Sequence, residues 1–79
     1  MPRFYFDVIC GAAFICDDYG HECRGIEAAK ADAMSTAEEL TRERLRTGQL
    51  QDIRVDVHDE QRRPVLSVTV LMTVERHPA

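Results

Sequence analysis

The residues best suited to bind a metal ion lie between positions 16 and 23 of this 79-residue chain. Cys16, His21 and Cys23 carry the thiolate and imidazole groups that zinc prefers as ligands, and Cys10 would join them if it faced Cys16 across a hairpin. Their spacing, C-x4-H-x-C, is not that of a zinc finger or zinc knuckle, and the chain has no C-x-x-C pair. Free cysteine also packs well in small cores. We therefore expect no cofactor and no metal, and a metal site on these residues is the alternative.

A second candidate for chemistry is an acid–base pair formed by Asp56 and His58. The two residues are two positions apart and so share one face of a strand. No nucleophile accompanies them, because Ser35 and Ser67 lie in the middle of predicted regular elements and neither has the G-x-S-x-G surroundings of a hydrolase serine. An ordinary solvated strand face explains the pair, and we expect no enzymatic activity.

Nucleic-acid binding is the third possibility that the sequence raises. Arg42, Arg44 and Arg46 form the densest basic stretch, near the end of a predicted helix, where the helix dipole also favours basic residues. The formal net charge of -4 and the pI near 5.2 leave no excess of basic groups for phosphates or for an anionic membrane. Neither nucleic acid nor a membrane is an expected partner.

Hydrophobic periodicity indicates the elements that must position these residues. Residues 3–9 alternate as a strand with Phe4, Phe6 and Val8 on one face, and residues 14–16 can return antiparallel as a hairpin. The run 17–20, DDYG, is typical of a tight turn. Two later strands are predicted over 53–58 and 65–74. Residues 25–47 predict the one long helix, whose sheet-facing stripe comprises Ile26, Ala29, Ala33, Ala37 and Leu40, flanked by Met34, Thr41 and Leu45.

Together these elements predict a single domain over 1–79 with an α+β fold. In ββαββ order, one helix would pack on a four-stranded, mainly antiparallel sheet. The first and last strands are the most apolar and are predicted to be central, which gives the strand order 2-1-4-3, with 2-1-3-4 as the alternative. A chain of this size has a marginal core unless a second copy shares an interface.

Several short motifs resemble a known family. They are MPRFYF at the start, DDYGHE over 17–22, EAA over 27–29, and Asp59-Glu60 followed by Arg63-Pro64-Val65. As a set they resemble a family of short bacterial proteins catalogued as a domain of unknown function, with a typical MPRYFF opening, a D-E-x-G turn, an L-E-A-A helix start and a D-E-x-G-R turn. The resemblance spans nearly the whole chain and implies its fold but no activity. Arg62 replaces the usual glycine of the last turn, so a looser or longer hairpin is expected there.

Protein association is the function that the sequence favours. The last strand is apolar on both faces, which a sheet face open only to water does not require. With neither a signal peptide nor a membrane span recognisable, we expect a small cytoplasmic protein that acts as a homodimer. An unknown protein partner is the other form of association that the sequence leaves open. The alternative is a regulatory nucleic-acid-binding or antitoxin-like module. The expected interaction surface is the sheet face away from the helix, around Tyr5, Asp56, His58, Thr69 and Leu71.

Overall fold

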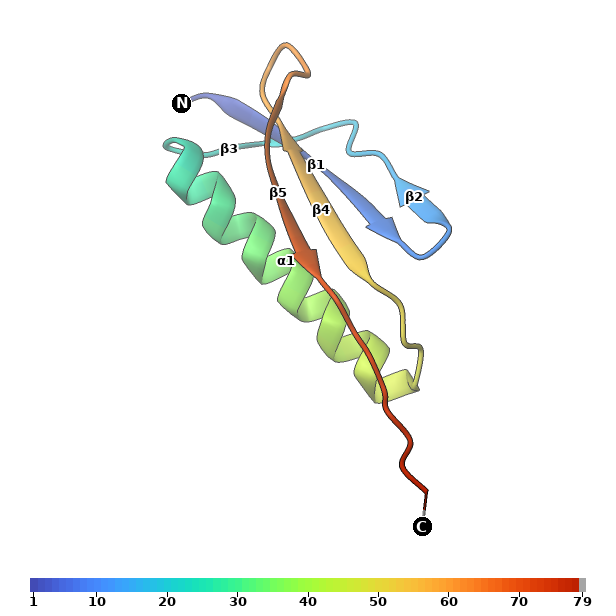
Figure 1. Cartoon of the computed structure of the whole chain (residues 1–79). Coiled ribbons are helices and arrows are strands. Elements are labelled where there is room, and N and C mark those ends of the chain that lie inside the picture. The colour runs from blue at the N-terminus through green and yellow to red at the C-terminus, as the bar shows by residue number, and fades with distance from the viewer. Residues whose placement is uncertain (79) are drawn as a thin grey trace.

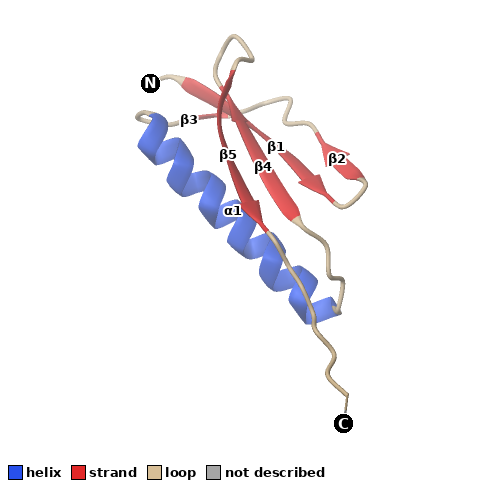
Figure 2. Ribbon diagram, viewed as in Figure 1, coloured by secondary structure: helices blue, strands red, loops and turns tan. Residues whose placement is uncertain are grey.

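The computed structural model describes residues 1–78. One helix lies along one face of a twisted antiparallel sheet, so the predicted α+β fold is confirmed (Figures 1 and 2). In chain order the elements are β1 (Arg3–Cys10), β2 (Ala13–Ile15), β3 (His21–Glu22), α1 (Ile26–Thr47), β4 (Ile53–His58) and β5 (Pro64–Val70). The two-residue strand β3 was not expected from the sequence, and it pairs with the first residues of β1.

The main sheet has the order β2-β1-β4-β5. The third and fourth predicted strands correspond to β4 and β5, so the preferred order 2-1-4-3 is wrong and the alternative order 2-1-3-4 is found. The reason lies in strand direction. Both β1 and β5 run antiparallel to β4, and a β5 placed beside β1 would have had to pair in parallel. With β4 in the centre, every neighbouring pair is antiparallel and β5 returns through a short turn as a hairpin.

The last strand is also shorter than predicted. It ends at Val70, which pairs with Ile53, the first residue of β4, so residues further along have no strand beside them. The backbone N–H of Met72 instead donates to Oδ1 of Asp52 at 3.0 Å. Residues 71–78 carry no regular structure and run on beyond the end of the sheet (Figure 1).

The core lies between α1 and the two central strands. Ile53, Val55 and Val57 of β4 are fully buried, as their alternation predicted. Small side chains on the helix allow it to lie close to them, because its buried residues are all alanines: Ala29, Ala33 and Ala37. Ile26, the first residue of the predicted sheet-facing stripe, is not part of the core, since it is 55 % exposed. Cys23 joins the core instead.

Both turns that the sequence indicated are closed by aspartate side chains. Asp17 accepts hydrogen bonds from the backbone N–H groups of Tyr19 and Gly20, and Asp59 does the same for Gln61 and Arg63. Arg62 occupies the place of the usual glycine in a closed turn, and the β4–β5 register shifts beside that turn at Val57/His58. Arg62 adopts a left-handed conformation with φ 62°, the one that glycine would favour, and its N–H donates to the Asp59 carbonyl at 2.9 Å.

Candidate functional site

The open face of the sheet carries a polar cluster centred on Asp7. The Asp7 side chain is only 8 % exposed, and its Oδ1 accepts the backbone N–H of Asp17 at 2.8 Å. A guanidinium nitrogen of Arg62 lies 3.6 Å from the same oxygen. His58 Nδ1 lies 3.4 Å from Oδ2, but without the alignment of a hydrogen bond. A buried carboxylate is thus held by one N–H donor and two cationic or ionisable neighbours from the second hairpin.

Arg62 closes this cluster by reaching back over the first strand. Its guanidinium lies over the ring of Tyr5, 4.6 Å from the ring centroid. The same group donates to the carbonyl of Asp17 at 3.2 Å and to Sγ of Cys16 at 3.1 Å. One side chain therefore joins the β4–β5 turn to β1 and to the loop that follows β2.

Asp56 stands directly opposite Asp7 in the register between β1 and β4. Two like charges at such a position repel each other unless cations neutralise them. Here Arg54 bonds both Asp56 oxygens at 2.9 and 3.0 Å, and the hydroxyl of Ser67 donates to Oδ1 at 2.6 Å. Partial burial acts to raise the pKa of Asp56, but the hydrogen bonds from Ser67 and Arg54 outweigh it and hold the pKa below its usual value.

The turn aspartate Asp17 also has a lowered pKa. Partial burial would raise it, and hydrogen bonds from the N–H groups of Gly20, Phe6 and Tyr19 outweigh that effect. A carboxyl whose folded pKa lies below its unfolded value of 3.8 contributes stability above that value. This contribution is lost as the pH falls below 3.8 towards the folded pKa.

An Asp17→Asn variant is therefore expected to lose less stability on acidification than the unchanged protein. Urea unfolding followed by circular dichroism at about pH 7 and about pH 3 measures this difference. Asp18→Asn, at the exposed neighbouring position, is the matched control and should behave like the parent. An acid-induced loss that is as large in Asp17→Asn as in the parent would contradict the assignment.

The expected interaction surface does come together on one sheet face. The register pairs Tyr5 with His58, and Thr69 of β5 faces Arg54 of β4 on the same side. Tyr5, Asp56 and His58 are partly buried within the polar cluster, whereas Thr69 and Leu71 are exposed. Strand alternation predicted that Asp7 lies on this face, but not that it is buried there or that Arg62 joins it, because an aspartate in a strand and an arginine in a turn are ordinary surface residues.

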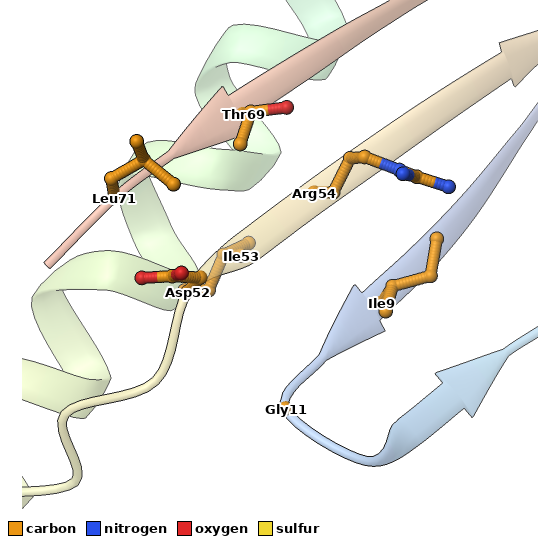
Figure 3. Close-up of a pocket in the computed structure, with 7 residues that line it drawn as sticks. All are labelled: Ile9, Gly11, Asp52, Ile53, Arg54, Thr69 and Leu71. Carbon is orange, nitrogen blue, oxygen red and sulfur yellow. The ribbon is translucent and has the colours of Figure 1, made fainter.

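A hollow of about 400 Å³ lies at the lower end of this face. Figure 3 shows its row of side chains across three strands, with Ile9 from β1, Arg54 from β4 and Thr69 from β5. Leu71 flanks the row just after β5 and is 72 % exposed. The lining is mixed, with apolar side chains such as Ile9 and Leu71 beside the charged Asp52 and Arg54.

A second, more apolar depression runs between α1 and β5. It comprises two adjoining hollows of about 330 and 380 Å³, both lined by Glu38 and Val70. Met34 and Leu45 border it from the helix and are 53 % and 58 % exposed. In the described part of the chain the buried hydroxyl of Thr41, which also lines this groove, has no hydrogen-bond partner.

The cysteines do not gather as the sequence suggested. The β1–β2 register places Cys10 opposite Ala13, so it does not face Cys16, and its buried thiol contacts Arg44 and Gln51. Cys16 is exposed beside Arg62. His21 and Cys23 do lie together, and Asp32 of α1 is the neighbour that sequence spacing did not reveal.

The arginines near the end of α1 have partners within the chain. Arg42 bonds Glu38 at 2.9 Å, Arg46 pairs with Glu43, and Nε of Arg44 lies 3.3 Å from Sγ of Cys10. Each of the three guanidinium groups therefore has a carboxylate or sulfur neighbour within the chain. Among residues 1–78, moreover, no helix combines the length and apolar character needed to cross a membrane.

These features define a small α+β module with one helix on an antiparallel sheet, a polar cluster on the open face and an apolar groove beside an edge strand. The family model of a domain of unknown function, DUF6894, matches residues 3–71, and the chain belongs to this family. No curated protein and no solved structure matches the chain.

Proposed function

We propose that the protein is a non-enzymatic association module that acts as a homodimer through the edge of β5 and the adjoining groove on α1. The observation that carries this proposal is that the edge strand β5 is uncharged and has an unpaired outer side. From Pro64 to Val74 the sequence, PVLSVTVLMTV, has no charged residue. Within the described residues no strand pairs with the outer side of β5.

An uncharged edge strand makes a free monomer prone to unwanted pairing with other chains. Its unpaired backbone groups can pair with any other strand, and natural proteins protect such edges with charges, prolines, bulges or a covering element. In β5 these devices are confined to one end, where Pro64 and the register shift at Val57/His58 lie. The remaining strand, up to Val70, has an ideal composition for pairing, and a regular partner strand would satisfy it.

A second copy of the chain is the occupant that the groove fits best. A two-fold axis beside β5 would pair the two edge strands antiparallel and place the two helices side by side on one face of a continuous sheet. Glu38 and Arg42 line the groove one helical turn apart, so antiparallel helices would bring Glu38 of one copy near the Arg42 of the other. Met34 and Leu45, both largely exposed in a single copy, would be buried between them.

The oligomeric state tests this proposal. We expect a dimer in sedimentation or light scattering at micromolar concentration, and a Leu45→Glu variant should weaken it at least about tenfold, or about 1.4 kcal/mol, because the new charge would be buried in the interface. Leu71→Glu, just beyond β5, should weaken it as well. Phe14→Glu is the matched control, since Phe14 is 62 % exposed on β2 at the opposite edge of the sheet.

Two outcomes would reject the proposed interface. A parent protein that stays monomeric at about 100 µM would lack the association, since such a dimer would be weaker than roughly 5 kcal/mol. A dimer that Phe14→Glu disrupts and Leu45→Glu leaves intact would place the contact on the open face near β2. A cytoplasmic location, an additional protein partner and the alternative role in nucleic-acid regulation stay predictions. A pull-down from the native cell would separate the last two.

A further inference from the structure

Three side chains of metal-ligand type converge beside the first turns of α1. His21 comes from β3, Cys23 from the segment before the helix, and Asp32 from the helix itself. Nε2 of His21 lies 3.0 Å from Oδ2 of Asp32, and Sγ of Cys23 lies 3.5 Å from the same oxygen. All three ligand atoms lie within 4.8 Å of one another. The dimer interface proposed above does not involve these residues.

We propose that His21, Cys23 and Asp32 bind a divalent transition-metal ion of the zinc type. Tetrahedral zinc has bonds of about 2.0 Å to nitrogen and oxygen and about 2.3 Å to sulfur, which separates neighbouring ligand atoms by about 3.3 to 3.6 Å. The two separations at Asp32 Oδ2, 3.0 and 3.5 Å, are close to these values. The third separation, between Nε2 of His21 and Sγ of Cys23, is at most 4.8 Å, and side-chain rotation would bring it to the tetrahedral value.

The backbone around the site holds the ligands in place. His21 pairs with Phe4 in the β1–β3 ladder, and its ring stacks on Phe6 with centroids 4.4 Å apart and planes 9° apart. The N–H of Cys23 donates to the carbonyl of Pro2 at 3.0 Å. Asp32 is fixed by a regular helix. Since each ligand is positioned by an element that forms without metal, binding would require little further ordering.

Charge and exposure also suit a cation. In the structure the Cys23 thiol donates a hydrogen bond to Oδ2 of Asp32. A divalent ion would balance one thiolate and one carboxylate and release that proton to solvent. The His21 and Asp32 side chains are 52 % and 51 % exposed, whereas Cys23 is 4 % exposed. The ion would therefore have protein on its inner side and a water-filled fourth position outside.

Titration of the chelator-treated full chain with Co²⁺ tests the site. We expect one equivalent of Co²⁺ to produce a thiolate-to-cobalt charge-transfer band and the visible bands of a tetrahedral ion, and Zn²⁺ to remove both. Cys23→Ser should abolish the charge-transfer band. Asp32→Asn, at an exposed helix position, should weaken binding at least about tenfold. Cys16→Ser is the matched control, because this thiol lies beside Arg62 and should not affect the bands.

Absence of a charge-transfer band at one equivalent would overturn the proposal and leave a hydrogen-bonded cluster only. A band that survives Cys23→Ser and disappears in Cys16→Ser would overturn it as well, in favour of adventitious binding at the exposed thiol. Circular dichroism confirms that each variant is folded. If Cys23→Ser does not fold, Asp32→Asn decides, and unchanged affinity in that variant would reject the site.

Discussion

An Ala33→Leu variant is expected to lose about 2 kcal/mol of unfolding free energy, because overpacking a tight core typically costs 1 to 3 kcal/mol. Ala33 is fully buried in the cluster that α1 forms with the sheet, and Val55 and Val57 of β4 in the same cluster are also fully buried. Three extra heavy atoms have no space between these side chains. Either the helix moves off the sheet or neighbouring side chains leave their preferred rotamers.

Urea unfolding followed by circular dichroism measures this loss as a lower midpoint. The matched control is Ala31→Leu, two residues away on the exposed side of α1, where leucine keeps good helix propensity and meets no packed side chain. Its midpoint should stay close to that of the parent. If Ala33→Leu were as stable as Ala31→Leu, the helix would not lie on β4 as closely as the structure has it.

The second large effect is expected at Asp7, where Asp7→Ala should destabilise the fold by roughly 2 to 3 kcal/mol. Its carboxylate is the shared acceptor of the Asp17 N–H and the neighbour of the Arg62 guanidinium. Removal leaves the N–H without its acceptor and Arg62 without its counter-charge. Asp7→Asn retains an acceptor oxygen and should lose less than Asp7→Ala.

A double-mutant cycle of Asp7→Asn with Arg62→Ala isolates the charge interaction between the two groups. We expect a small but favourable coupling energy, because the Arg62 side chain is exposed and solvent screens its charge. Asp18→Ala, in an exposed position of the neighbouring turn, should leave the stability of the protein unchanged. A coupling energy near zero, with Asp7→Ala no worse than Asp18→Ala, would show that the cluster contributes nothing to the fold.

Sequence alternation alone predicted which side chains of β1 and β4 form the core. Phe4, Phe6, Ile53, Val55 and Val57 are all buried, because a strand with a period of two has only one way to present them to a helix. The pairing order of the strands could not be predicted in this way. Both candidate orders bury the same alternating residues, and the choice depended on strand direction.

The clusters illustrate the same limit. His21 and Cys23 are two residues apart, so their proximity was visible in the sequence, but Asp32 reached them only because α1 starts immediately beside β3. Likewise, Asp7 is buried because Arg62, 55 positions further along the chain, folds back over Tyr5. Neither Asp32 nor Arg62 could be recognised as a partner from sequence periodicity, because a contact across the fold depends on how whole elements pack.

The sequence by itself determined the helix and four of the strands, the inward faces of β1 and β4, and the uncharged stretch after Pro64, because these follow from local propensity, periodicity and composition. Only the tertiary structure decided that this stretch forms the free edge of the sheet and that the polar residues collect into two separate clusters. The physical reason is that strand pairing and helix docking join residues far apart in the chain. Their free energy depends on direction and packing, which no local pattern records.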